Sequence, residues 1–253
     1  MTGWRHTHLG AKLRRAGVEG SYRALRRRAA RSLIALGARG LREDSSRDPF
    51  HLLFETFIGR VNESGPSPRV LEIGSRGTRV DPRFTAGARY VGFDLHPGAN
   101  VDVAGDAHAL SSYFPEPFDA LYAISTIEHL AMPWRFVAEA NAVLRDGGLL
   151  FLATHHAWPL HAQPWDFWRF SPSAFELLLR AETGFRICGC ALGLPASLVP
   201  LGTEASTAGI ADQVSYMGIS VLAERIGPAR EDPWAGLEIG ELFAHAYPEK
   251  LGP

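Results

Sequence analysis

The segment that most constrains the fold of this chain is Val70–Gly77 (VLEIGSRG), a short apolar run that ends in a glycine turn. Glycines after a buried strand let the backbone approach a ligand at the carboxyl edge of an open α/β sheet. Twenty residues after Gly74, Asp94 ends a second apolar run, where an acid can accept hydrogen bonds from a ribose diol. These features indicate an α/β domain that binds a nucleotide-containing cofactor. They also fit a nicotinamide enzyme, although the G-x-G-x-x-G spacing of those enzymes is absent.

Short apolar runs alternate with helical segments from residue 69 onward, which predicts a parallel, doubly wound α/β sheet with a Rossmann-like arrangement. The seven expected strands are Arg69–Gly74, Arg89–Asp94, Val101–Gly105, Phe118–Ser125, Leu149–Thr154, Phe185–Leu192 and Val214–Ile226. Helices are expected at His51–Val61, Pro133–Leu144 and Ser171–Glu182. The turn Arg145–Gly148 (RDGG) should end the second helix, and the small-residue segment Leu192–Asp212 should form a lid or a substrate loop.

The N-terminal part of the chain is unusually basic. Residues 1–42 hold 11 of the 26 Lys and Arg residues and a single acid, Glu19. Apolar residues at helical spacing (Tyr22, Leu25, Ala29, Leu33 and Leu36) and arginines four apart (Arg23, Arg27 and Arg31) predict an amphipathic basic helix. We therefore expect a helical extension and linker over residues 1–48 and one domain over residues 49–253. The segment 21–37 either packs on that domain or contacts an acidic partner, such as a membrane surface, a polysaccharide or a nucleic acid.

The cysteines and the hydropathy of the chain bear on its compartment. The two cysteines, Cys188 and Cys190, are interpreted as buried free thiols in a reducing cytosol. No apolar stretch approaches the ~20 residues that span a bilayer. The predicted localisation is cytoplasmic, with association at a membrane surface through the basic helix as an option.

Four segments in order resemble one known family. The turn at Val70–Gly77 is followed by Asp94 and by Asp106 in Gly105–Ala107 (GDA), and Phe118–Leu130 (FDALYAISTIEHL) comes next. Pro133–Thr154, which ends in RDGGLLFLAT, completes the set. Together they resemble the class I S-adenosylmethionine-dependent methyltransferases, of the type 11 kind, over about residues 69–226. The departure from the family pattern is at the turn, where Arg76 and Thr78 stand in places usually held by glycines.

The resemblance implies S-adenosylmethionine as cofactor and a role for each matched residue. Glu72 would lie near the methionine part of the cofactor, Asp94 would bind the ribose, and Asp106 would bind the adenine amino group. His108 would border the adenine, and His129, after the fourth strand, would belong to the cofactor pocket. The full predicted set is Glu72, Gly74, Ser75, Gly77, Asp94, Leu95, Asp106, Ala107, His108, Ser125 and His129.

The segment Thr154–Phe170 (THHAWPLHAQPWDFWRF) follows the fifth expected strand and should hang over the cofactor edge. It holds three histidines and three tryptophans, and histidine is the natural base near neutral pH. We predict His155 or His156 as general base, with Asp166 orienting it or holding a metal ion. A divalent metal such as Mg²⁺ could instead acidify a hydroxyl directly. No dedicated set of metal ligands is predicted, and the tryptophans could simply fix the loop to the core.

The function hypothesis is O-methylation of a sugar, a polysaccharide or another hydroxylated small metabolite, with a histidine base. One alternative is a nucleic-acid methyltransferase whose basic arm grips phosphates, and others are a non-catalytic adaptor and a nicotinamide oxidoreductase. A nucleic-acid partner is not expected, because the part beyond residue 42 has 15 basic and 26 acidic residues, a formal charge of −11. Ser125–Glu128 (STIE) also lacks the Asn/Asp-Pro-Pro-aromatic motif.

Overall fold

The computed structural model describes residues 25, 28–37, 39, 47–77, 83–202 and 204–234. The chain divides into two compact units, Met1–Asp44 and Ser45–Pro253. In the first unit, residues 28–37 are helical, whereas Tyr22, Arg23 and Arg27 of the predicted basic helix lie outside the described residues. Contact of segment 21–37 with an acidic partner stays a prediction. Within the described ranges, no helix is long and apolar enough to cross a membrane.

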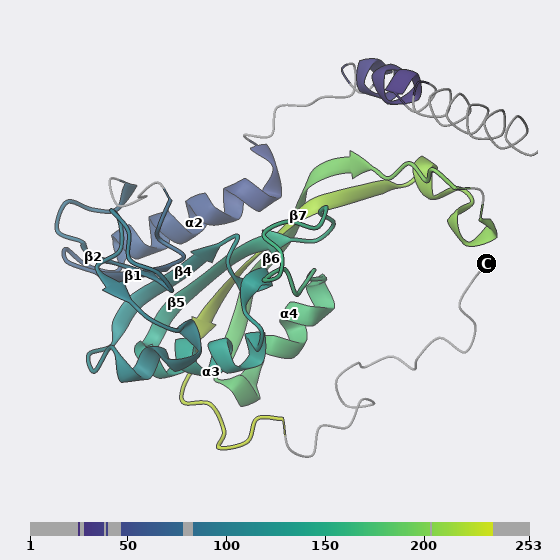
Figure 1. Ribbon diagram of the computed structural model, residues 1–253. Coiled ribbons are helices and arrows are strands. Elements are labelled where there is room, and N and C mark those ends of the chain that lie inside the picture. The colour runs from purple at the N-terminus through teal and green to yellow at the C-terminus, as the bar shows by residue number, and fades with distance from the viewer. Residues whose placement is uncertain are drawn as a thin grey trace, which may run out of the picture. The chain divides into compact units, whose positions relative to one another are not determined.

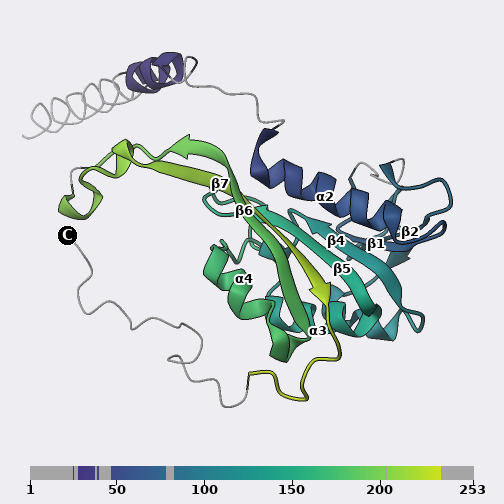
Figure 2. The same ribbon diagram turned by 180° about the vertical axis from the view of Figure 1, so that it is seen from behind.

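The second unit is built on one seven-stranded sheet with the strand order β3-β2-β1-β4-β5-β7-β6 (Figures 1 and 2). The order reverses between β1 and β4, the crevice where open α/β sheets bind ligands. The predicted α/β fold with a doubly wound, Rossmann-like sheet of seven strands is therefore confirmed. The strands are β1 (Arg69–Ile73), β2 (Arg89–Asp94), β3 (Val103–Ala104), β4 (Phe118–Ile124), β5 (Leu144–His155), β6 (Phe185–Ser197) and β7 (Val214–Arg225).

The sequence predicts a parallel sheet, and this prediction is wrong at one edge. Strands β1 to β5 pair in parallel, but β7 runs antiparallel to both β5 and β6. Between β6 and β7, the described residues form only single 3₁₀ turns, at Ala205–Thr207 and Ile210–Asp212. Parallel neighbours need a long crossover, usually a helix, so a direct return forces β7 to run antiparallel.

Helices cover both faces of the sheet, so its strands are buried between two apolar layers. Helix α2 (Pro49–Glu63) lies on one face, and α3 (Pro133–Val143) and α4 (Pro172–Leu178) lie on the other (Figure 1). The Asp48 carboxylate caps the N-terminus of α2, because it accepts the Phe50 N–H at 3.0 Å. It also accepts the Leu194 N–H at 2.7 Å, which connects the start of α2 to β6. The layer under α2 is largely aromatic, with Phe57, Phe84, Tyr122 and Phe151 at its centre.

Several element bounds differ from the predicted ones. The predicted turn Arg145–Gly148 is an irregularity inside β5, which already pairs with β4 at Leu144. The predicted helix Ser171–Glu182 ends at Leu178, because the Thr183 hydroxyl accepts the Arg180 N–H and starts a separate 3₁₀ turn. Strand β3 is shorter than predicted, and β6 is longer. The hairpin of β6 and β7 therefore takes up the first part of the expected lid and projects past the neighbouring strands (Figure 2).

Both cysteines are free and exposed, which corrects the prediction of buried thiols. Cys188 and Cys190 lie on β6, the edge strand of the sheet, beside a register shift between Ile187 and Gly189. An edge strand is flanked on one side only, so its side chains keep more solvent contact than those of central strands.

Candidate functional site

The glycine turn begins where β1 ends, and its geometry requires glycine. Gly74 has a φ of +84°, in the left-handed region that favours glycine. Its N–H and that of Ser75 both donate to the Phe93 carbonyl of β2, at 2.8 and 3.2 Å. A Cβ atom on Gly74 would overlap the side chain of Thr126, which follows β4. The turn therefore packs closely against Thr126 at the end of β4, where the strand order of the sheet reverses.

The predicted ribose and adenine acids lie one strand apart along the same edge. The Asp94 carbonyl at the end of β2 accepts the N–H of Gly105 at 3.0 Å, which places Asp106 next to it. Each carboxylate is held in a local turn: Asp94 accepts the His96 N–H at 3.0 Å, and Asp106 accepts the His108 N–H at 2.9 Å. The structure thus aligns the Gly74 turn, Asp94 and Asp106 in one row across β1, β2 and β3.

His108 joins this row to helix α3. Its Nδ1 lies 2.7 Å from the Asp106 carboxylate, and its Nε2 accepts the Met132 N–H at 3.2 Å. These two partners assign the neutral tautomer with the proton on Nδ1. Burial acts to raise the pKa of Asp106, but the hydrogen bonds from His108 outweigh it and leave that pKa below its usual value. Asp106 is therefore an ionised acceptor at neutral pH.

Three further predicted residues lie along this edge. Leu95 directly follows Asp94 and is 56% exposed, while Ala107 is buried. Ser125, the first residue after β4, has a φ of +49° and donates its N–H to the Ala153 carbonyl at 2.8 Å. A non-glycine residue in this region is strained, and such strain concentrates at functional sites. These positions are consistent with the predicted cofactor contacts.

Glu72 lies near the end of β1, and the glycine turn follows it. The buried Glu72 carboxylate accepts the Tyr90 hydroxyl and lies opposite Tyr122 of β4. Burial, followed by the charge of Glu72, raises the pKa of Tyr122 far above its usual value. Arg76 is exposed, and the Gly77 carbonyl accepts the side-chain amide of Asn100. Thr78 and Asp81 lie outside the described residues.

A second group of polar residues surrounds Glu128, which was not among the predicted site residues. Glu128 lies in the 3₁₀ turn η4 (Ile127–His129) directly after β4, and its side chain has no exposed surface. One carboxylate oxygen accepts the Thr154 hydroxyl at 2.7 Å. The other, Oε1, lies 2.8 Å from Nδ1 of His155 and 3.9 Å from Nε2 of His129. The Glu128–His129 pair after the fourth strand was the only sequence signal for this residue.

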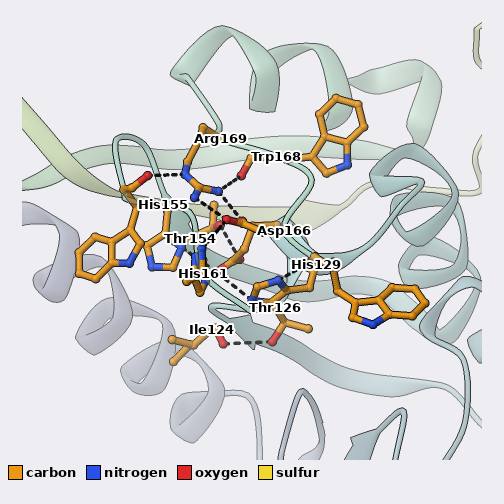
Figure 3. A network of polar contacts seen from close by, with 12 residues as sticks. Ile124, Thr126, His129, Thr154, His155, His161, Asp166, Trp168 and Arg169 are labelled. Atoms are coloured by element: carbon orange, nitrogen blue, oxygen red, sulfur yellow. Dashed lines mark hydrogen bonds and ion pairs between the residues drawn. The ribbon is translucent and has the colours of Figure 1, made fainter. Parts of the chain in front are cut away.

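The rings of His129, His155 and His161 lie close together (Figure 3). The ring of His161 lies 4.9 Å from the rings of both His129 and His155, measured between centroids. Nδ1 of His129 lies 2.7 Å from the Trp165 carbonyl, so that nitrogen carries the proton and Nε2 keeps its lone pair. Trp158 stacks on His155 at 4.6 Å. We call Glu128, His129, His155 and His161 the Glu128 cluster.

The two predicted base candidates have different surroundings. Burial lowers the pKa of His155 and outweighs the opposing charge of Glu128, so His155 is neutral at neutral pH. His156 uses Nδ1 to contact the Phe170 carbonyl at 2.7 Å, and its N–H donates to Met217 at 2.9 Å. His155 therefore belongs to the Glu128 cluster, whereas His156 fastens the loop to β7.

Asp166 holds the loop through Arg169. The guanidinium donates to both carboxylate oxygens, at 2.6 and 2.8 Å, and also to the carbonyls of Trp158, Pro159 and Trp168. The hydrogen bond from Arg169 is the main reason why the pKa of Asp166 lies far below its usual value. Asp166 also accepts the N–H of His161 at 2.9 Å. Its partners are thus Arg169 and His161, rather than the predicted His155 or His156.

Replacing Asp166 with alanine is expected to loosen residues 156–170, because Arg169 would lose its bidentate partner. Limited proteolysis should cut this loop faster in Asp166→Ala, and the melting temperature should fall. The exposed Asp212 of the β6–β7 connection provides the control, since Asp212→Ala should leave both measurements unchanged. Equal behaviour of the two variants would contradict the fastening role of Asp166.

Known proteins resemble this chain in sequence and in fold. Residues 71–152 match the family described as "Methyltransferase domain", and they carry the glycine turn, Asp94, Asp106 and Glu128. The match covers part of the chain and includes the segments that carry the resemblance to class I S-adenosylmethionine-dependent methyltransferases. The predicted family is therefore confirmed.

Individual relatives of this methyltransferase are distant. It is 34% identical over 110 residues to a protein named ubiquinone biosynthesis O-methyltransferase from Methylobacterium sp. (strain 4-46), across 36% of this chain and 43% of that protein. A solved S-adenosylmethionine-dependent methyltransferase from Archaeoglobus fulgidus has 15% identity and a TM-score of 0.51, over 72% of this chain and 97% of its own. Another from Mesorhizobium loti has 15% identity and a TM-score of 0.49, over 72% and 100%. The Archaeoglobus structure shows that the fold is shared.

The residues of this methyltransferase fit the family's cofactor. The left-handed Gly74 leaves no room for a side chain between β1 and β4, so backbone alone borders that part of the edge. The Ser75 hydroxyl is buried with no hydrogen-bond partner among the described residues, which leaves a donor beside the turn. Asp106 keeps 59% of its side chain exposed and can accept a further donor. Glycine turn and acids are the groups that the resemblance assigned to S-adenosylmethionine.

Proposed function

We propose that this methyltransferase methylates a hydroxyl group of a small molecule, and that the hydroxyl loses its proton at the Glu128 cluster. The observation that carries the proposal is the buried Glu128 carboxylate, which lies 2.8 Å from His155 at the end of the strand that borders the glycine turn. A hydroxyl acceptor must lose its proton during transfer, so a proton-handling group beside the cofactor edge favours O-methylation. The name of the Methylobacterium relative, an O-methyltransferase, supports the same chemistry.

Cofactor and acceptor would be held by different parts of the chain. When bound, S-adenosylmethionine supplies an electrophilic methyl group. The Gly74–Gly77 backbone, Asp94 and Asp106 would hold it along the sheet edge, in the roles that the family resemblance implies. Of the two predicted base candidates, only His155 lies in the Glu128 cluster, where the hydroxyl would lose its proton. The remaining contribution of the protein is to keep hydroxyl and methyl group aligned.

The acceptor proposed is a hydroxylated ring, such as a sugar or a similar metabolite. Trp158, Trp165 and Phe167 are 40%, 60% and 43% exposed and belong to the same loop as His155 and His161. Exposed aromatic faces beside polar groups suit ligands that have both apolar faces and hydroxyl groups. The Mg²⁺ ion considered at Asp166 gains no support, because Arg169 and the His161 N–H already occupy that carboxylate.

Cofactor binding is tested by calorimetry on the full chain. We expect S-adenosylmethionine to bind and a nicotinamide dinucleotide not to bind. Asp94→Ala should weaken S-adenosylmethionine binding by about 10- to 100-fold, because a hydrogen bond to a charged group contributes about 1.5–3 kcal/mol. Asp212→Ala, on the β6–β7 connection, is the control and should bind normally. Binding that is absent in the native chain, or unchanged in Asp94→Ala, would refute the cofactor assignment.

The acceptor is tested with labelled S-adenosylmethionine against matched sugars and phenols that carry a hydroxyl or an amine at the same position. The proposal predicts label only in the hydroxyl compounds. Transfer of the label to the amines alone, or to nucleic acid, would refute O-methylation of a small molecule. The assignment of S-adenosylmethionine as cofactor would then still stand.

A further inference from the structure

We infer that the Glu128 cluster binds a divalent transition-metal ion, of the zinc, iron or cobalt kind, through Glu128, His129, His155 and His161. This inference deepens the proposed function, because it specifies that the hydroxyl is acidified by a metal ion rather than deprotonated by a free histidine. The four residues come from the end of β4, the end of β5 and the loop that follows.

Three buried ligand atoms in this cluster have no hydrogen-bond partner within the described part of the chain. They are Oε1 of Glu128, Nδ1 of His155 and Nδ1 of His161. Two close contacts of these atoms lack the angles of a hydrogen bond: Nδ1 of His155 lies 2.8 Å from Oε1 of Glu128, and Nδ1 of His161 lies 3.3 Å from Oδ2 of Asp166. The ligand atoms that Glu128, His155 and His161 offer all lie within 4.8 Å of one another. An unpartnered buried polar atom destabilises the folded state, and one cation would satisfy all three.

His129 is oriented as a fourth ligand. Its Nδ1 donates to the Trp165 carbonyl at 2.7 Å, which leaves the lone pair on Nε2, the atom 3.9 Å from Oε1 of Glu128. Metal-binding histidines usually donate their other ring nitrogen in this way, and metal-binding carboxylates are usually held by a further hydrogen bond. Thr154 provides that bond to Glu128 at 2.7 Å. The outer contacts are thus arranged as around a metal ion (Figure 3).

The ligand types select the class of ion. Three imidazoles and one carboxylate suit zinc, iron or cobalt, whereas Mg²⁺ and Ca²⁺ prefer oxygen ligands. One carboxylate leaves a divalent ion with a net positive charge, so it can polarise a further oxygen and lower the pKa of a hydroxyl. In the transfer, the O–H proton leaves to solvent and the oxygen bonds to the methyl carbon. The C–S bond breaks and its electrons stay on sulfur, which yields S-adenosylhomocysteine.

The metal role and the free-base role of His155 exclude each other. A neutral imidazole that binds an ion through Nδ1 carries its proton on Nε2 and has no lone pair left for a hydroxyl proton. A water molecule that donates to the unpartnered atoms is the remaining explanation of their positions. Direct metal measurements separate these cases.

The test uses the full chain without a polyhistidine tag. After treatment with a chelator and its removal, Zn²⁺ is titrated by calorimetry and Co²⁺ by visible absorption. We expect about one ion per chain. His161→Ala and Glu128→Gln should each weaken binding at least about 100-fold, because outer contacts alone are worth about 10- to 100-fold. His156→Asn is the matched control, since His156 adjoins the cluster but bonds to Phe170, and its metal affinity should be unchanged.

A conservative pair keeps the test valid if cluster variants fold poorly. Thr154→Val removes the hydroxyl that holds Glu128 and should weaken metal binding about 10- to 100-fold, while Thr154→Ser should restore it. Absence of binding, or equal weakening by His156→Asn, overturns the site. Full methyl transfer by metal-free enzyme overturns the metal role but leaves O-methylation standing. Metal binding without transfer to any hydroxyl supports the site and refutes the proposed function.

Discussion

Replacing His155 with asparagine is expected to lower kcat for methyl transfer by about 10²- to 10⁴-fold, the usual contribution of a positioned proton-transfer group. The asparagine amide can still place an N–H where Nδ1 faces Glu128, 2.8 Å away, so the buried carboxylate keeps a neighbour. It supplies neither a basic nitrogen nor a metal ligand. Single-turnover assays with labelled S-adenosylmethionine measure the loss, and calorimetry should show unchanged cofactor affinity.

The adjacent histidine is the control for this experiment. His156→Asn keeps a donor for the Phe170 carbonyl, because the asparagine Nδ2 lies where the histidine Nδ1 was. Its loss of kcat should therefore stay below about tenfold, well short of the effect expected for a proton-transfer group. If both variants lose turnover equally, the assignment of His155 is wrong. A loss of cofactor affinity in His155→Asn would likewise show that the residue acts on binding rather than on transfer.

Replacing Gly74 with alanine is expected to weaken both stability and cofactor binding. At a φ of +84° an alanine is strained by about 1–3 kcal/mol, and its Cβ would in addition overlap Thr126. For a domain of this size the strain alone corresponds to a fall in melting temperature of about 2–12 °C. Because the same backbone borders the cofactor edge, S-adenosylmethionine affinity should fall as well. Thermal unfolding and calorimetry measure the two effects.

Gly77 offers the matched control within the same turn. A Cβ atom there meets nothing within 4 Å, so Gly77→Ala should change the melting temperature little. Combining Gly74→Ala with Thr126→Ala should recover the part of the loss that comes from the overlap, while the strain at Gly74 remains. A Gly74→Ala variant as stable as Gly77→Ala would contradict the structural account of the turn.

The row of residues along the ends of β1, β2 and β3 could be predicted from sequence because its sequence signals are local. Gly74, Asp94 and Asp106 each lie at the carboxyl end of a strand or within two residues of it, and parallel strands present these ends at one edge. The order and spacing of these three residues along the chain therefore predict that they lie at the same edge of the sheet. Sheet direction at β7 could not be predicted in the same way, since an apolar strand has the same pattern in either direction and only the missing crossover helix distinguishes the two.

The sequence by itself determined the α/β fold, the resemblance to the methyltransferase family and the place of Gly74, Asp94 and Asp106 at one sheet edge, because strand periodicity and glycine turns act over short stretches. Only the tertiary structure decided which polar side chains meet beyond the ends of β4 and β5. It brought Glu128 from one strand end, His155 from another and His161 from the loop into one cluster, and it assigned Asp166 to Arg169. Those contacts depend on how a loop folds back over the sheet. Side-chain hydrogen bonds, rather than periodicity, fix that path, so spacing along the chain did not reveal it.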